Sequence, residues 1–254
     1  MRTIALLNQK GGVGKTTCAA NIGAGLALLG RKVLLVDMDP QANLTEGLGV
    51  ALGTGQASVY DCLINCHDVE SAVVRITEGL DILPSCIDLA GAEAELISLQ
   101  GREWRLKTAL STVDGYDYII IDAPPSLGQL ALNTMYAVRE IFIPLQTEYY
   151  PLKGVAKLLE TVAEVQKWSN TGTAIAGIVG TCYDSRKNLN KEVVAQFREH
   201  FGELAFRTVI RDNVALAEAP AASLDIFRYA KSSRGAEDYA ALCQEIIAME
   251  ETGD

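Results

Sequence analysis

A glycine-rich segment at residues 10–17, Lys-Gly-Gly-Val-Gly-Lys-Thr-Thr, constrains the fold of this 254-residue chain more than any other stretch. It follows an apolar run at residues 4–7 and precedes a helix-forming stretch at residues 18–27. A strand, a glycine loop and a helix in this order are the context of a phosphate-binding loop. Glycines let the backbone approach an anion closely, and the amide groups and the positive end of the helix then face the phosphates.

The spacing departs from the standard phosphate-binding loop at one position. That pattern has a glycine six residues before the lysine of Gly14-Lys15-Thr16, and Gln9 stands there instead. Lys15 is predicted to reach the β- and γ-phosphates, and the Thr16 hydroxyl to bind Mg²⁺. The segment also has a second lysine, Lys10, which its own nucleotide does not require. We interpret Lys10 as a positive charge offered to a second nucleotide across a dimer.

Two other apolar runs end in carboxylates. Residues 32–37 lead into Asp37 and Asp39, and residues 116–122 end at Asp122. Open α/β sheets bind ligands at the carboxyl ends of their strands. An isolated Asp-x-Asp-Pro usually caps a helix in a solvated turn, but its place after a P-loop favours a role in catalysis. Asp122 has the Walker B arrangement, in which an acidic group holds Mg²⁺ opposite the P-loop hydroxyl.

Residues 10–17 resemble the deviant Walker A signature of the ParA/MinD family of P-loop ATPases. The later motifs resemble the ParA (Soj-like) partitioning branch over essentially the whole chain. The resemblance implies one domain, residues 1–254, with an α/β fold: a doubly wound, mostly parallel sheet with helices on both faces. It implies ATP and Mg²⁺ as cofactors and a switch loop at residues 123–126. It also places Asp39 at the attacking water and gives Asp37 a supporting role.

The resemblance extends to individual site residues. The expected catalytic residues are Lys10, Lys15 and Asp39, and the expected Mg²⁺ ligands are Thr16, Asp122 and Asp39. The expected nucleotide-binding residues are Gly11, Gly12, Val13, Gly14, Lys15, Thr16, Thr17, Arg211 and Asp212. Many relatives carry Pro-Arg where Arg211 and Asp212 stand here, which leaves the adenine contacts open. The loop at residues 146–154 resembles the family's entry into a long helix that forms dimer contacts in relatives.

The charge distribution bears on nucleic-acid binding. The net charge of −10 and a pI of about 4.8 argue against a uniformly basic DNA-binding protein, so DNA would need a local patch. Residues 181–235 carry a net charge of +2 and the remainder −12. Mixed charges usually mark a solvated face, but relatives bind DNA non-specifically through this part as ATP dimers. The expected salt-sensitive contacts are Arg186, Lys187, Arg211, Arg228, Lys231 and Arg234; Arg186 alternatively holds the nucleotide-side loop.

The resemblance implies a dimerising ATPase that partitions a chromosome or plasmid on the nucleoid, in a bacterial or archaeal cytoplasm. A partner of the ParB type would stimulate its hydrolysis. Related ATPases position carboxysomes or chemoreceptor clusters, so the cargo stays open. A MinD-like membrane ATPase is the first alternative, and it needs a basic amphipathic C-terminal helix. Residues 244–254 are acidic instead, so we expect no stable membrane association.

Three further alternatives are weaker. An iron–sulfur carrier needs a C-terminal Cys-x-x-Cys, which is absent, and a related tyrosine kinase needs a tyrosine-rich tail, where this chain has only Tyr239 nearby. A monomeric ATPase would leave Lys10 without a role. The six cysteines are typical of reduced thiols. Cys62, Cys66 and His67 are close in sequence, but without a second pair we predict buried thiols on one helix face rather than a metal site.

Hydrophobic periodicity and turn residues give a coarse outline of the elements. The first apolar run has a strand's length and leads into the P-loop, so it predicts no signal peptide. No apolar stretch approaches the ~20 residues of a membrane span. We predict helices at residues 16–29, from 58 onward, 90–99, 103–110, 127–138, 152–168, 191–201 and 233–249. We predict strands from residue 3 and at 32–37, 73–76, 80–85, 116–122, 140–145 and 175–181, a loop at 47–57, and an adenine-facing block at 209–220.

Overall fold

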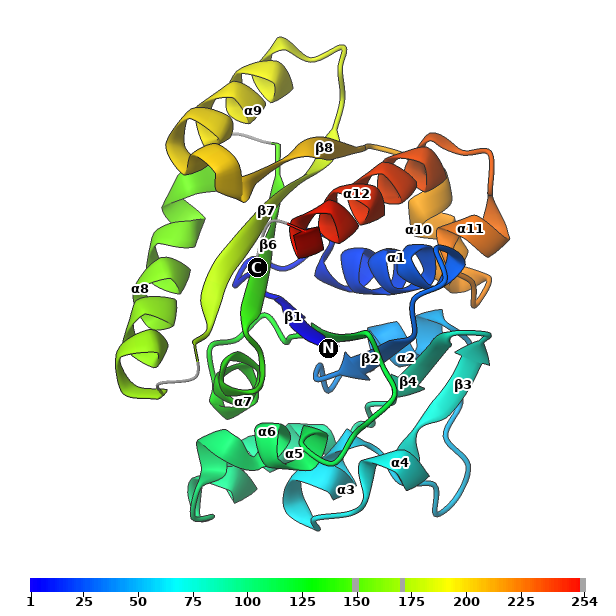
Figure 1. Cartoon of the computed structure of the whole chain (residues 1–254), viewed down its shortest axis with the longest axis vertical. Helices are drawn as coiled ribbons and strands as arrows, with labels where there is room; N and C mark the ends of the chain where they lie inside the picture. The colour runs from blue at the N-terminus through cyan, green and yellow to red at the C-terminus, as the bar shows by residue number, and fades with distance from the viewer. Residues whose placement is uncertain (148–150, 170–171, 252–254) are drawn as a thin grey trace.

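The computed structural model describes residues 1–147, 151–169 and 172–251 (Figure 1). These residues form an eight-stranded sheet with the order β3-β4-β2-β5-β1-β6-β7-β8. Neighbouring strands in the described ranges pair in parallel, except β3 and β4, which are antiparallel at one edge of the sheet. The strands are β1 (Arg2–Leu6), β2 (Val33–Asp37), β3 (Val74–Thr77), β4 (Leu80–Leu83), β5 (Tyr118–Asp122), β6 (Glu140–Gln146), β7 (Ala174–Tyr183) and β8 (Ala205–Arg211).

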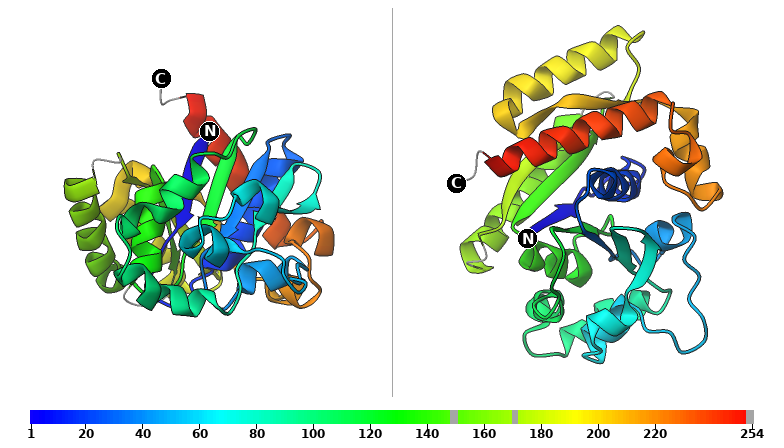
Figure 2. Two further views of the ribbon diagram at one scale, coloured as in Figure 1. Left: turned by 90° about the horizontal axis from the view of Figure 1, so that it is seen from below. Right: turned by 45° about the vertical axis from the view of Figure 1, so that its right-hand side comes forward.

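Helices cover both faces of the sheet, so the predicted doubly wound α/β fold is confirmed. Figures 1 and 2 show α1 and α12 lying together on one face and α3 to α7 on the other. The helices are α1 (Lys15–Leu28), α2 (Asn43–Gly47), α3 (Val59–Ile64), α4 (Val69–Ala72), α5 (Leu89–Ile97), α6 (Arg105–Leu110), α7 (Gln129–Ala137), α8 (Pro151–Ser169), α9 (Asn188–Phe201), α10 (Val214–Ala221), α11 (Ile226–Tyr229) and α12 (Arg234–Glu251). Short 3₁₀ turns add η1 (Arg102–Trp104) and η2 (Gly202–Leu204).

The central strands are buried on both faces, because successive side chains of a strand point to opposite sides. In β1, Ile4 and Leu6 join the core under α1 and α12, whereas Ala5 belongs to the core on the opposite face, which α3 to α9 cover. The register brings Leu6 and Asp37 level with Asp122. The sheet thus fixes the ends of β1, β2 and β5 at one edge, where the glycine loop and both carboxylate motifs emerge.

Most predicted elements are present, but the C-terminal third differs from prediction. We expected one adenine-facing block at residues 209–220, and the structure divides it between the end of β8 and helix α10. The strand β8 was missed because it lies at the sheet edge, where buried Phe206 and Ile210 are separated by polar residues such as the exposed Arg207. The short helices α2 and α11 were also missed. No helix among the described ranges is both long and apolar enough to span a lipid bilayer.

Candidate active site

The glycine loop between β1 and α1 has the geometry of an anion cradle. Gly12 and Gly14 have φ angles of 72° and 90°, a conformation that side chains with a Cβ disfavour. A Cβ built on Gly11 or Gly12 would meet no atom within 4 Å, so this side of the loop is open. No side chain of the described residues caps α1, whose first-turn N–H groups therefore stay available to an anion.

Two neighbouring strand ends hold the loop in place. The Thr181 hydroxyl at the end of β7 donates to the Val13 carbonyl oxygen at 2.9 Å. The Gln146 amide at the end of β6 donates to the Gly12 carbonyl oxygen at 2.8 Å. Sequence reasoning missed both residues, although each is a polar side chain at a strand's carboxyl end. These bonds point the carbonyl groups away from the open face and leave the N–H groups for a ligand.

Lys10 lies exposed at the rim of the loop. Its ammonium Nζ donates to the Gln146 Oε1 atom at 2.7 Å, within the same chain. Gln146 therefore contacts both lysine and loop, because its amide nitrogen holds Gly12. In the single chain this hydrogen bond holds the Lys10 ammonium beside its own loop.

Lys15 and Asp122 are buried together beneath the open loop. Lys15 is 7% exposed, and burial lowers the pKa of its ammonium, while the Asp122 and Asp39 carboxylates oppose this shift. Asp122 is fully buried, and neither of its oxygens has a hydrogen-bond partner among the described residues. Burial, and then the nearby Asp37, raise the pKa of Asp122 well above its ordinary value; the Thr16 hydroxyl and Lys15 offset part of the shift. An unpaired buried carboxylate facing a hydroxyl is a donor set that suits Mg²⁺.

Asp37 has a different environment from Asp122 although it is equally buried. Its Oδ2 accepts hydrogen bonds from the Thr45 backbone N–H at 2.9 Å and from the Thr45 hydroxyl at 2.7 Å. Its Oδ1 accepts from the Asp39 N–H at 3.1 Å. Burial raises the pKa of Asp37 to about 6 despite these bonds. Both oxygens are occupied by the protein, which fits the supporting role predicted for Asp37.

Asp39 is held in the loop between β2 and α2, with 9% of its surface exposed. Its Oδ1 accepts from the Gln41 N–H at 3.0 Å, which orients the carboxylate. Its carbonyl oxygen accepts from the Ala42 N–H at 2.9 Å and from the Ser85 hydroxyl at 2.7 Å. The sequence analysis did not single out Ser85, which lies 46 residues from Asp39 along the chain. The fold thus gathers Lys15, Thr16, Asp39 and Asp122 around one open loop.

Comparison with known proteins agrees with this geometry. A family model described as AAA domain matches residues 1–175. The chain is 48% identical to the sporulation initiation inhibitor protein Soj of Bacillus subtilis over 97% of this chain and 98% of that protein. It is 49% identical to the chromosome-partitioning ATPase Soj of Treponema pallidum, covering 98% of each. The chain belongs to the ParA/MinD family of P-loop ATPases, in its Soj-like branch. The family resemblance seen in the sequence is confirmed.

Solved structures of the ParA/MinD fold superpose on this chain over nearly its full length. A Mycobacterium smegmatis protein named cobyrinic acid a,c-diamide synthase, solved with ADP and magnesium, is 37% identical with a TM-score of 0.87 and covers 100% of this chain and 97% of its own. The cell division ATPase MinD of Pyrococcus furiosus is 28% identical with a TM-score of 0.80, covering 98% and 99%. The P-loop ATPase fold is therefore shown for the whole described chain.

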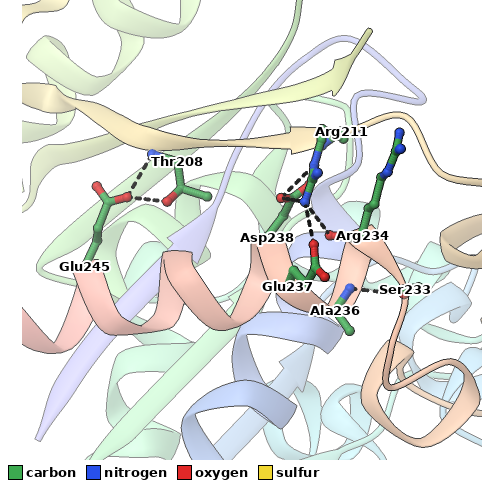
Figure 3. A network of polar contacts seen from close by, with 8 residues as sticks. All are labelled: Thr208, Arg211, Ser233, Arg234, Ala236, Glu237, Asp238 and Glu245. Atoms are coloured by element: carbon green, nitrogen blue, oxygen red, sulfur yellow. Dashed lines mark hydrogen bonds and ion pairs between the residues drawn. The ribbon is translucent and has the colours of Figure 1, made fainter. Parts of the chain in front are cut away.

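The expected DNA contacts of this ParA-type chain fall into two groups. Arg211 is half-buried and its guanidinium binds Asp238 at 2.7 Å and Glu237 at 3.0 Å (Figure 3). Arg228 pairs with Asp225, and Arg186 pairs with Asp184 at 2.9 Å. The second group comprises exposed side chains that form no ion pair within the described ranges: Lys187, Lys231 and Arg234.

Of two further predicted sites of the ParA-type chain, the structure places one, the start of the expected adenine loop. Asp212 is exposed, and its N–H donates to the Tyr183 carbonyl oxygen at 2.9 Å, which ties the start of the expected adenine loop to β7. In the loop at residues 146–154, residues 148–150 lie outside the described residues. The expected dimer contacts there are therefore not located.

The interpretation of Cys62 and Cys66 as buried thiols on one helix face is wrong for the second cysteine. Cys62 is buried in α3, but Cys66 lies beyond the end of that helix, exposed and with a φ angle of 54°. The Arg105 guanidinium donates to its sulfur at 2.9 Å. Helix periodicity failed here because α3 ends at Ile64. No group of three or more metal-ligating residues occurs within the described ranges.

Proposed function

We propose that this chain is a single-domain ATPase that hydrolyses ATP with Mg²⁺, dimerises with ATP bound, and partitions a chromosome or plasmid over the nucleoid. The names of its relatives support the biological role, since two at 48–49% identity are Soj proteins. The observation that carries the chemistry is Asp122. It is a buried carboxylate without a hydrogen-bond partner among the described residues, beside Thr16 and Lys15 under an open glycine loop.

The side chains divide the work of phosphoryl transfer, which depends on positioning and electrostatics. The Lys15 ammonium and the loop N–H groups hold the phosphates, and Thr16 and Asp122 hold Mg²⁺. Bound Mg²⁺ would neutralise charge that develops on the phosphate oxygens. Asp39 orients the attacking water. Its position just past β2, at the same sheet edge as Asp122, supports this role.

Lys10 links hydrolysis to dimerisation in this proposal. Lys10 lies exposed at the rim of the loop, and its ammonium donates to the neutral amide oxygen of Gln146 at 2.7 Å. In an ATP dimer Lys10 leaves Gln146 and contacts the partner's phosphates, where a charge supplied in trans favours the transition state. Hydrolysis removes the bridging γ-phosphate and releases the subunits. A ParB-type partner stimulates this step.

The exposed cations support a DNA-binding surface. Lys187, Lys231 and Arg234 lie exposed on the part of the chain with net positive charge, and an ATP dimer would double them. Such contacts give weak binding that falls steeply with salt, because each neutralised phosphate releases counterions. Nucleotide state then times the attachment to DNA.

The membrane-binding alternative finds no support at the end of α12. Ile246 is fully buried against the core, and the Glu250 carboxylate binds Arg31 at 2.6 Å. An apolar face that already packs against the sheet is not available to lipid. Flotation with anionic liposomes in ATP tests this directly. Robust flotation of the wild-type protein would favour the MinD-like alternative.

The decisive experiment compares the wild type with Lys15→Ala, Lys10→Ala and Asp39→Ala. Each is tested for ATP-dependent dimer mass and for salt-sensitive retardation of non-specific DNA. Lys15→Ala should lose every nucleotide-dependent property, whereas Lys10→Ala should bind ATP without hydrolysing it efficiently. Asp39→Ala should accumulate as a DNA-bound dimer. A monomeric Asp39→Ala at saturating ATP would contradict the proposal.

A further inference from the structure

Asp39 is held by a closed ring of buried hydrogen bonds that no sequence motif indicates. The ring joins three elements: the end of β2, helix α2 and the residue pair after β4. Asp37 accepts the Asp39 N–H through Oδ1 and binds Thr45 twice through Oδ2. The Thr45 hydroxyl accepts from the Ser85 N–H at 3.0 Å, and the Ser85 hydroxyl donates to the Asp39 carbonyl oxygen at 2.7 Å. We call these four residues the Asp39 ring.

The Thr45 hydroxyl links the two halves of the Asp39 ring. It is the only ring atom that both donates to Asp37 and accepts from Ser85. Thr45 is 2% exposed and Ser85 is 2% exposed, so water cannot readily replace a lost partner. Thr45 lies in α2, a helix of five residues whose preceding Ala42 has a left-handed φ angle of 52°. So short a helix has little stability of its own and depends on such tertiary bonds.

We propose that Thr45 is a positioning residue for ATP hydrolysis, acting on Asp39 through Asp37 and Ser85. The inference rests on the catalytic role proposed for Asp39. Removing the hydroxyl takes one donor from Asp37 and the acceptor from the Ser85 N–H. The Ser85 side chain then loses the constraint that aims it at the Asp39 carbonyl oxygen. Both supports of the Asp39 loop loosen. Within the described ranges no hydrogen bond joins the Asp39 ring to the P-loop, and the Asp39 carboxylate that acts on Lys15 is itself unchanged.

The test substitutes Thr45 by valine, which keeps the shape and removes the hydroxyl. A displacement of about 1 Å in a catalytic group can cost about 10²-fold in rate, so partial loosening should lower kcat by about 10-fold. The KM for ATP should stay within about two-fold, because the phosphate-binding groups are untouched. Thr45→Ser restores the hydroxyl and should recover most of kcat. Ser85→Ala removes only the bond to the Asp39 carbonyl oxygen and should lower kcat by a smaller factor, about three-fold.

Thr173→Val is the matched control. Thr173 is 1% exposed, and its hydroxyl donates to the carbonyl oxygens of Met135 and Val138 at 3.0 and 2.7 Å. It lies just before β7, at the end of the sheet opposite the glycine loop. The control should lower the urea midpoint of unfolding as Thr45→Val does, with kcat within about two-fold of the wild type.

The outcomes separate the inference from the proposed function. If Asp39→Ala hydrolyses ATP at the wild-type rate, the proposed role of Asp39 fails. If Asp39→Ala is inactive while Thr45→Val and Ser85→Ala retain the wild-type kcat, only the positioning role fails. An equal loss of kcat in Thr173→Val would assign the effect to general destabilisation and would also overturn the inference. Should Thr45→Val not fold, kcat and KM of Ser85→Ala decide the question.

Discussion

Asp37 and Asp122 are direct neighbours across β2 and β5, and both are fully buried. Burial raises the pKa of each carboxyl; the negative charge of Asp37 raises the pKa of Asp122 further, and that of Asp39 raises the pKa of Asp37. Asp37 receives three hydrogen bonds, whereas neither Asp122 oxygen receives one from the part of the chain that the structure describes. The two carboxylates therefore have separate uses, one to hold the loop that carries Asp39 and one to receive a cation. Burying the Asp122 carboxylate without a hydrogen bond lowers the free energy of unfolding of the cation-free protein.

We predict that Asp122→Asn stabilises the nucleotide-free protein and abolishes hydrolysis. The amide removes a buried charge and sacrifices no hydrogen bond recorded within the described chain. Lys15 offsets only part of the burial cost of this carboxyl, so its replacement should raise the free energy of unfolding at pH 7.5 by roughly 1–3 kcal/mol. Urea unfolding without Mg²⁺ measures this, and Mg²⁺-dependent ATP turnover measures the loss. A destabilised apo variant would mean that Asp122 has a structural role in the absence of Mg²⁺.

The same two carboxylates predict how stability depends on pH. Each has a folded-state pKa above the unfolded value, so the folded protein binds more protons within the interval between the two values. The free energy of unfolding contributed by these groups is therefore greatest at low pH and falls as pH rises through that interval. For Asp37 the interval runs from 3.8 to about 6. Urea midpoints between pH 4.5 and 8 should show a fall that Asp122→Asn reduces. Identical pH profiles for the two proteins would contradict this assignment.

The sequence predicted the parts of the site that one local motif contains. The glycine loop, the buried Asp122 at the end of β5 and the alternation of strands and helices all have short signals along the chain. The partners of Asp39 could not be predicted in the same way, because Ser85 reaches it from the segment that follows β4. The strand β8 was missed for a related reason: its edge position mixes polar with apolar residues and weakens the periodic signal.

Glu93 of α5 caps α7, the helix that follows the loop at residues 123–126. Its carboxylate accepts from the Gln129 N–H at 2.7 Å and from the Leu130 N–H at 3.3 Å, at the start of α7. Glu93→Ala should lower the free energy of unfolding by about 1 kcal/mol, as loss of a helix cap does. Glu95→Ala on the same helix is the control, because the Glu95 side chain is exposed and its carboxylate accepts a hydrogen bond from the Tyr60 hydroxyl and not from a helix N-terminus. Equal urea midpoints for both variants would show that the Glu93 cap does not contribute measurably to stability.

Glu245 of α12 protects the sheet edge at β8. Its carboxylate accepts from the Arg207 and Thr208 backbone N–H groups at 2.9 and 2.7 Å (Figure 3 shows the contacts with Thr208). An edge strand with free N–H groups pairs readily with another chain. Glu245→Ala should therefore self-associate with increasing concentration, measured by light scattering without nucleotide. Glu245→Gln keeps one acceptor oxygen and should remain closer to the wild type. A monodisperse Glu245→Ala protein would show that the edge needs no such cover.

Arg211 and Lys231 should respond oppositely to substitution, although both were predicted to contact DNA. The Arg211 guanidinium is paired with Asp238, whose side chain is only 10% exposed, so Arg211→Ala leaves a nearly buried carboxylate without its partner. We expect about 1–3 kcal/mol lower stability and little change in DNA affinity at temperatures where the variant is folded. Lys231 is exposed, and Lys231→Ala should weaken DNA binding for all sequences alike and reduce the salt dependence, with an unchanged urea midpoint. Fluorescence anisotropy over a salt series measures both. If a folded Arg211→Ala protein loses DNA binding as strongly as Lys231→Ala does, Arg211 contacts DNA and this prediction is wrong.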